Sequence, residues 1–210
     1  MNISVFLAPG FEEIEALTVV DYLRRAGQNV VSVSLQESGI HAGGAGQTVV
    51  TGSHGISVVA DIELKGYEEY LNGSLPDVIY LPGGMPGAEN LSKNQFLFDF
   101  IRKMAESGKI VAAMCASPAV VLARTGILAG RRWTCYPKME NELEKWCGST
   151  LDAEKLTENS VHVKNVPFVF DGNVLTGRGP GTAEQFAMKL VELTTGEQIA
   201  DRIRISVCQR

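Results

Sequence analysis

The sequence predicts an α/β fold of the flavodoxin-like type, a three-layer sandwich in which helices cover both faces of a mostly parallel sheet. Two observations lead to this prediction. Short apolar runs at residues 2–8, 77–81 and 110–114 have the length and composition of buried parallel strands. Segments with apolar residues at helical spacing alternate with these runs, and this alternation implies right-handed crossovers that place helices on both faces.

The N-terminal half supplies the first of these elements. Residues 2–8 form a strand that Pro9 and Gly10 close, and residues 29–35 form a second strand. Between them, residues 12–26 form a helix that ends at Gly27, with an apolar face made of Ile14, Leu17, Val20 and Leu23. Further along the chain, an amphipathic helix spans 95–107 and ends at Gly108.

A glycine-rich segment, residues 39–55, interrupts the alternation. Glycines stand at positions 39, 43, 44 and 46, and two short strand-like runs follow at 47–51 and 56–60. We expect an antiparallel hairpin with residues 52–55 as its turn.

The pattern is looser in the C-terminal part of the chain. We expect a short strand at 133–136, a charged helix at 138–146 and a hairpin formed by 161–164 with 166–170. A brief strand at 174–176 and helices at 182–193 and 197–207 complete the chain. We find no internal repeat, linker or low-complexity segment, so one domain over residues 1–210 is expected.

Cys115 lies at the junction on which the site prediction rests. It directly follows the strand at 110–114 and precedes an apolar helix, with Ser117 as the expected N-cap and Pro118 at the first helical position. This is the arrangement of a nucleophile elbow, in which a nearby helix N-terminus lowers the thiol pKa and favours a thiolate. The alternative is a buried structural cysteine, because free cysteines are among the most buried residues.

Two other loops should reach the same sheet edge, because ligands gather at the carboxyl ends of parallel strands. Glu15 is expected to point toward Cys115, where partial burial would raise its pKa and allow it to donate a hydrogen bond. Gly83 and Gly84 offer backbone N–H groups for an oxyanion. The alternatives are a helix-dipole role for the acids at 12, 13 and 15, and a plain tight turn at the glycines.

Composition narrows the function classes. The formal net charge of −5 and the pI near 5.3 argue against binding to nucleic acid, and no basic run invites a membrane surface. There is no signal-peptide pattern and no apolar run long enough to span a bilayer, so we expect a cytoplasmic protein. The four cysteines form no CxxC pair, which argues against a disulfide framework or a zinc site.

Five stretches in this order carry a family resemblance: FEEIEA at 11–16, RRAG at 24–27, LPGG at 81–84, AAMCA at 112–116 and LTGRGPGT at 175–182. The chain resembles the ThiJ/PfpI superfamily, which has a class I glutamine amidotransferase-like fold, and within it the branch of the parkinsonism-associated protein deglycase. The resemblance implies a flavodoxin-like homodimer without a cofactor or metal. Cys115 matches the nucleophilic, oxidation-sensitive cysteine, Glu15 the acid that shares its proton, and the glycines at 83 and 84 the loop facing it.

The chain departs from this family at one site position. Where the deglycase has a Thr-Thr-His-Pro-like stretch, this sequence has Thr134, Cys135, Tyr136 and Pro137. Tyr136 therefore replaces the histidine beside the cysteine, and tyrosine is a poor base near pH 7 but a usable hydrogen-bond donor. This argues against a peptidase. We place Tyr136 and Ala116 with the glycines as substrate-binding residues, and an edge-strand arginine of some relatives corresponds to His54.

Three functional hypotheses follow. The first is a deglycase or glyoxalase-type enzyme in which Cys115 adds to a reactive dicarbonyl or its protein adduct. The second is a redox-sensing stress chaperone whose Cys115 is oxidised to a sulfinate without turnover. The third is a phosphate binder that uses the glycines of 177–181 at a helix N-terminus. The family resemblance also implies a homodimer, for which Arg25, ten residues after Glu15 on the same helix, is the expected contact.

Overall fold

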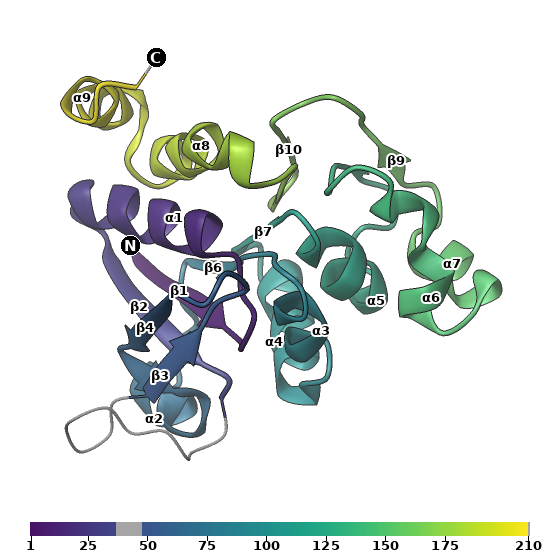
Figure 1. The fold of residues 1–210 in the computed structure, drawn as a ribbon. Helices are drawn as coiled ribbons and strands as arrows, with labels where there is room; N and C mark the ends of the chain where they lie inside the picture. The colour runs from purple at the N-terminus through teal and green to yellow at the C-terminus, as the bar shows by residue number, and fades with distance from the viewer. Residues whose placement is uncertain (37–47, 210) are drawn as a thin grey trace.

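A seven-stranded sheet forms the centre of the computed structural model, which describes residues 1–36 and 48–209 (Figure 1). Its strand order is β10-β11-β7-β6-β1-β2-β5, and all neighbouring pairs are parallel except β10 with β11. The strands are β1 Asn2–Leu7, β2 Asn29–Ser34, β5 Ile62–Glu63, β6 Val78–Leu81, β7 Ile110–Met114, β10 Phe168–Asp171 and β11 Val174–Gly177. The predicted flavodoxin-like fold is confirmed.

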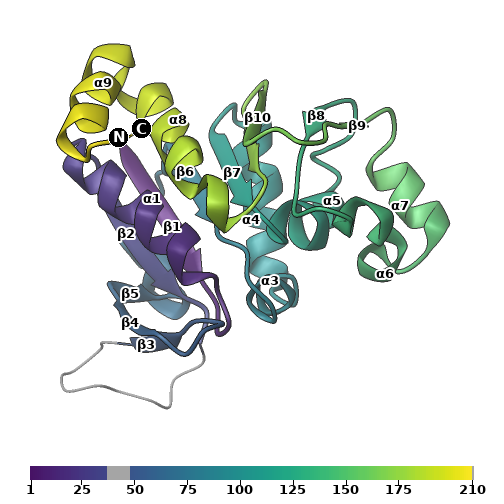
Figure 2. The same cartoon turned by 45° about the horizontal axis from the view of Figure 1, so that its top comes forward.

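Side chains of β1 alternate between two cores, one on each face of the sheet. Val5 and its neighbours at 3 and 7 pack in one core, which contains residues of α1 (Glu13–Arg25), α8 (Ala183–Thr195) and α9 (Glu197–Ser206). Phe6 packs in the other, with residues of α2 (Tyr67–Leu71), α3 (Gly87–Leu91) and α4 (Gln95–Glu106). Figure 2 shows α1, α8 and α9 together on one side of the sheet. None of the helices within the described ranges is long and apolar enough to cross a membrane.

The predicted antiparallel hairpin is confirmed for the residues that the structure describes. β3 (Thr48–Thr51) pairs with β4 (Ser57–Ala60) in a separate two-stranded sheet. The turn between them rests on the start of α1, because the backbone N–H of Ser53 donates to the carbonyl of Phe11 at 2.8 Å. The glycines at 39, 43, 44 and 46 lie outside the described residues.

The segment between β7 and β10 differs from the prediction. β8 (Arg132–Trp133) pairs in parallel with β9 (Val161–His162), and η3 (Met139–Asn141), α6 (Leu143–Cys147) and α7 (Thr150–Leu156) lie between them. The expected hairpin of 161–164 with 166–170 is wrong, because β10 pairs with β11 across a turn at Gly172, whose φ is +61°. The expected helix at 138–146 is interrupted at Glu142, so that only a 3₁₀ turn and a short helix form.

The buried face of α1 is only partly the one predicted, since Leu23 is buried and Val20 packs against the core but the other two residues do not. Ile14 and Leu17 are 56% and 42% exposed, whereas Glu13, Glu15 and Val19 are buried. The first turn of this helix therefore directs its acids into the protein and leaves two large apolar side chains at the surface. The short helices α2 and α3, which the sequence analysis missed, fill connections on the opposite face.

Candidate active site

Cys115 follows the last residue of β7 and adopts a left-handed backbone conformation with a φ of +59°. Non-glycine residues rarely adopt this conformation, and strained positions of this kind cluster at functional sites. Backbone hydrogen bonds hold the turn on both sides: Cys115 N–H donates to the carbonyl of Gly177 at 2.9 Å, and Tyr136 N–H donates to the carbonyl of Cys115 at 2.8 Å. The chain therefore forms the sharp strand-to-helix turn that the sequence predicted.

The turn after Cys115 is built differently from the predicted cap. Ser117 is buried and does not cap the helix; its Oγ donates to the carbonyl of Pro82 at 2.6 Å. The helix begins with a π-helical stretch, η2 (Pro118–Leu122), and continues as α5 (Ala123–Thr125). π-Helical turns are frequent at functional sites. The serine thus joins the elbow to the loop that follows β6.

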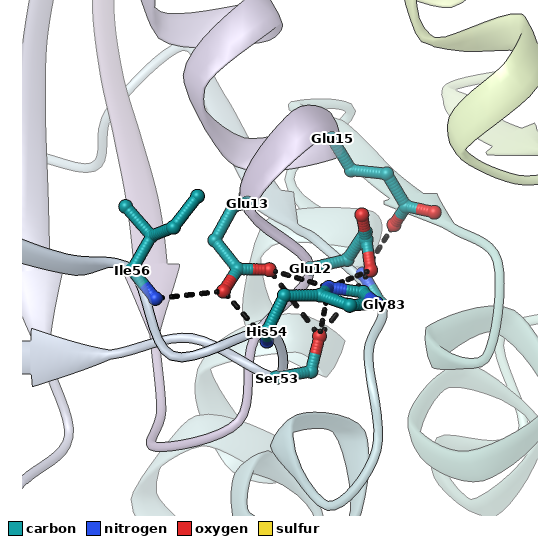
Figure 3. Close-up of polar contacts among 7 residues, drawn as sticks. All are labelled: Glu12, Glu13, Glu15, Ser53, His54, Ile56 and Gly83. Carbon is teal, nitrogen blue, oxygen red and sulfur yellow. Dashed lines mark hydrogen bonds and ion pairs between the residues drawn. The ribbon is translucent and has the colours of Figure 1, made fainter.

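Glu15 reaches this loop from α1. It is fully buried, and its Oε2 accepts a hydrogen bond from the Gly83 N–H at 2.7 Å (Figure 3). A Cβ at position 83 would lie 2.5 Å from Cβ of Cys115 and 2.9 Å from Oε2 of Glu15, so only glycine fits between the two. Oε1 of Glu15 is buried and has no hydrogen-bond partner among the described residues. The carboxyl group and the thiol therefore lie against the same glycine.

Burial controls the protonation of this pair. It raises the pKa of Glu15 to about 8, although the Gly83 N–H and the Cys115 thiol both act to lower it. Burial also raises the pKa of the Cys115 thiol, and the charge of Glu15 raises it further. The prediction of a thiol pKa lowered by the helix N-terminus is therefore wrong, because desolvation outweighs the nearby amides. Near pH 7 the pair holds its protons.

The amide groups of Gly84 and Ala116 face the Cys115 sulfur. Both backbone N–H groups form hydrogen bonds to it that lower the thiol pKa, against the larger effect of burial. Gly83 plays a different part, since its N–H is bound to Glu15. Of the loop glycines, Gly84 is thus the one with an amide directed at the sulfur.

Tyr136 lies on the open side of the elbow. Its side chain is 49% exposed and lines a cavity of about 390 Å³ together with Pro137 and residues Arg178, Gly179, Pro180, Gly181 and Thr182. Cys115 does not line this cavity, but its backbone is hydrogen-bonded to Tyr136 and to Gly177, the residue before Arg178. The structure therefore places a cavity beside the elbow, and the phenol at its edge.

A second group of polar residues beside Glu15 was missed in the sequence analysis. Oε1 of Glu13 accepts hydrogen bonds from the backbone N–H groups of His54 at 2.7 Å and Ile56 at 3.3 Å, and Oε2 lies 2.9 Å from Nδ1 of His54 (Figure 3). Burial acts to raise the pKa of Glu13, but hydrogen bonds from His54 lower it overall. Glu13 also raises the pKa of His54. The acid thus joins α1 to the hairpin, a contact across 41 residues that no local pattern indicates.

Arg25 lies apart from this site. It is at the C-terminal end of α1, its side chain is half exposed, and its Nε donates to Oδ2 of Asp21 at 2.6 Å. Glu15 is fully buried whereas the Arg25 side chain is half exposed, so the two side chains lie on different faces of α1.

Known proteins with a similar sequence match most of this chain. The chain is 37% identical over 197 residues to the Protein DJ-1 homolog B of Arabidopsis thaliana, and 33% identical over 194 residues to the Protein dj-1beta of Drosophila melanogaster. These matches cover 94% and 92% of this chain, but 39% and 89% of the relatives. The chain thus spans about two fifths of the length of the plant protein.

Solved structures agree with the fold and the family. The crystal structure of Drosophila melanogaster DJ-1beta superimposes with a TM-score of 0.80 at 31% identity, covering 99% of this chain and 97% of that one. Oxidised Toxoplasma gondii DJ-1 gives a TM-score of 0.78 at 30% identity, with coverages of 99% and 97%. The model of the DJ-1/PfpI family matches residues 1–193. On this evidence, the chain belongs to the DJ-1/PfpI family, in its DJ-1 branch.

Proposed function

We propose that this protein is a cofactor-free, cysteine-dependent glyoxalase or deglycase that acts on reactive dicarbonyls or on their protein adducts. The observation that carries the proposal is the pairing of a strained, buried Cys115 with a buried Glu15 across a single glycine. A thiol nucleophile with an acid–base partner within reach is what addition to an aldehyde requires. A Caenorhabditis elegans relative, 29% identical over 94% of this chain, is named a glutathione-independent glyoxalase.

The chemistry can be written for methylglyoxal. The Cys115 sulfur adds to the aldehyde carbon while Glu15 accepts the thiol proton, and the amides of Gly84 and Ala116 stabilise the developing oxyanion. Glu15 returns the thiol proton to this oxyanion, which gives a hemithioacetal. It then removes the aldehyde-derived proton and delivers it to the neighbouring carbon, while the hydroxyl proton passes to the oxygen of that carbon, so that the adduct becomes a thioester of lactate. Water hydrolyses the thioester, releasing lactate and restoring the thiol. The net reaction consumes one water and needs no external oxidant or reductant.

We expect Glu15→Gln to lower kcat/KM for methylglyoxal by roughly 10²- to 10⁴-fold, because the amide cannot accept the thiol proton. In the unaltered protein, kcat/KM should rise with pH and level off above the Glu15 pKa of about 8, where the carboxylate is the base. This rising limb should be absent from the variant. Lactate formation followed across pH provides the measurement, and unchanged activity in the variant would show that Glu15 has only a structural role.

The same substitution changes stability in a predictable direction. The native state retains the Glu15 proton between pH 4.5, the group's ordinary pKa, and about 8, whereas the unfolded state loses it. The unfolding free energy of the unaltered protein should therefore fall with rising pH across this window, by an amount that Glu15→Gln abolishes. Urea unfolding of both proteins at the two ends of the window separates this stability effect from the catalytic one.

A second candidate function is redox sensing, with a role as a stress chaperone. Two equivalents of peroxide, reduced to water, would oxidise the Cys115 sulfur to a sulfinate. The amides of Gly84 and Ala116 and a protonated Glu15 can donate hydrogen bonds to its oxygens. One similar solved structure is titled as oxidised DJ-1 from Toxoplasma gondii. This function predicts peroxide-dependent partner binding without lactate formation, whereas the enzymatic function predicts lactate formation by the reduced protein. Both require free thiols, and a reducing cytoplasm would keep them so.

We further propose that the protein is a homodimer that uses α1 and the hairpin. Ile14 and Leu17 on α1, and Ile56 and Val59 at the hairpin, are large apolar side chains with 42% to 56% of their surface exposed. Exposed apolar clusters of this kind mark interaction surfaces. The half-exposed Arg25 lies at the other end of the same helix, where its charge can meet a partner's surface.

Light scattering at micromolar concentration should therefore give the mass of a dimer. Arg25→Glu should shift the population toward the monomer, and Leu17→Asp should do so more strongly, because it places a charge in the apolar cluster. Leu151→Asp is the matched control, since Leu151 is 76% exposed on the distant helix α7. A monomeric unaltered chain, or an equal effect of the control, would contradict the proposed interface.

A further inference from the structure

A second cysteine lies in a group of metal-ligand side chains on the segment between β8 and β9. Cys135 follows β8, Glu140 lies in η3, and His162 is the last residue of β9. Cys135 is only 2% exposed, and the side chains of Glu140 and His162 are 13% and 15% exposed. One thiol, one carboxyl and one imidazole therefore lie close together where solvent hardly reaches them.

The polar atoms of these residues converge, although Sγ of Cys135 also donates to the carbonyl of Tyr136 at 3.4 Å. Sγ of Cys135 lies 3.7 Å from Nε2 of His162, and Oε1 of Glu140 lies 3.8 Å from Nδ1 of His162. A ligand atom from each residue can be chosen so that all three lie within 4.8 Å of one another. Oε2 of Glu140 and Nδ1 of His162 are buried and form no hydrogen bond within the described residues. Buried polar atoms without partners are rare and call for an explanation, which a bound ion would supply.

We propose that Cys135, Glu140 and His162 bind a Zn²⁺ ion. Thiolate, imidazole and carboxylate are the ligands that zinc prefers, at bond lengths of about 2.0–2.3 Å. Ligand atoms around a tetrahedral zinc ion are therefore roughly 3.5 Å apart. Those of this group lie within 4.8 Å of one another, so the side chains have to move closer together to bind the ion. Three protein ligands leave a fourth position for water. The site differs from the cysteine pairs that the sequence analysis sought, because it combines one cysteine with two residues of other types.

The charges around the site are compatible with this ion. Lys164 is the cation next to Glu140, with its Nζ 3.7 Å from Oε1, but its side chain is 70% exposed and can turn into solvent. Zinc displaces the proton of the Cys135 thiol, and this released proton balances the binding step. Once bound, the ion would connect η3 to the paired strands β8 and β9.

A second group, Glu12, Glu13 and His54, provides an internal comparison. Its ligand atoms also lie within 4.8 Å of one another, but they already bind each other, the backbone and Ser53, and the His54 side chain is 68% exposed. It contains no thiol. His54→Ala is thus a matched control, because it removes a histidine from a metal-ligand group that we do not expect to hold zinc.

The test uses the full chain, freed of metal by a chelator, with Zn²⁺ and Co²⁺ as the probes. We expect one equivalent of Zn²⁺ to bind and to raise the melting temperature by roughly 2–8 °C when in large excess over the dissociation constant. Co²⁺ at the site should show a thiolate-to-cobalt charge-transfer band in the near ultraviolet. Cys135→Ser should abolish this band, and Glu140→Gln or His162→Gln should weaken binding at least about tenfold.

Two controls make the result decisive. Cys115→Ser and His54→Ala should keep both the charge-transfer band and the thermal shift, because neither residue belongs to the site. If the unaltered chain binds no Zn²⁺, the proposal is overturned. The same holds if the band persists in Cys135→Ser or disappears in Cys115→Ser. Should Cys135→Ser not fold, Glu140→Gln retains the thiol and replaces only a carboxylate oxygen by an amide, and unchanged affinity in that variant also overturns the assignment.

Discussion

Replacement of Cys115 by serine is expected to lower kcat/KM for the conversion of methylglyoxal to lactate by on the order of 10³-fold or more. A hydroxyl group is a much weaker nucleophile than a thiol, and the buried Glu15 beside it cannot make up this difference. Serine is nearly isosteric with cysteine, so the strained turn at a φ of +59° should persist. Lactate formation, measured with circular dichroism as a check on folding, gives the result.

Cys208→Ser is the matched control for this prediction. Cys208 is a free cysteine that is exposed near the C-terminus, outside the site. We expect the variant to retain full activity. If Cys115→Ser also kept its activity, the dicarbonyl would react elsewhere on the protein, and the proposed nucleophile would be wrong.

Gly84→Ala should lower the free energy of unfolding more than the other alanine substitutions proposed for this protein. Gly84 has a φ of +90°, and a Cβ there would lie 2.5 Å from the carbonyl oxygen of Gly10 and against the backbone nitrogen of Glu12. These contacts are with backbone atoms, which cannot rotate away. We expect the unfolding free energy to fall by on the order of 3 kcal/mol or more, from strain in a disfavoured φ together with the clash. Urea unfolding measures this difference.

Gly108→Ala is the control that separates the steric clash at position 84 from the penalty of a positive φ. Gly108 has a φ of +69°, but no atom lies within 4 Å of where its Cβ would be. The alanine there meets only the conformational penalty, about 1 kcal/mol. Equal losses in the two variants would mean that the loop between β6 and α3 can move aside, and that the amide of Gly84 is not held rigidly toward the sulfur.

The sheet could be predicted from the sequence because its central strands are continuous apolar runs, such as 110–114, that nothing except burial explains. The segment at 132–162 could not. β8 and β9 are each two residues long and pair across nearly thirty residues, so they leave no periodic pattern. The two-residue turn Gly172–Asn173, by contrast, is a hairpin signal that the sequence does contain, and it joins β10 directly to β11.

The candidate site shows the same division. Cys115, Glu15 and the glycines at 83 and 84 could be located because parallel strands end at one edge of the sheet. The pKa of the thiol could not be predicted, since a sequence reveals a nearby helix N-terminus but not how deeply the sulfur is buried. The role of Glu13 was hidden as well, because His54 reaches it only through the folded hairpin.

The contacts that hold Cys115 also determine which neighbouring residues can change during evolution. Its position depends on main-chain atoms: the carbonyl of Gly177, the N–H of Tyr136 and the bare Cα of Gly83. Any residue other than proline can provide the N–H at position 136. The side chain there is consequently free to change, from the histidine of the resembling family to tyrosine, without displacing the sulfur. Mutation at position 136 can thus change the chemistry at the edge of the cavity while the Cys115 sulfur stays in place.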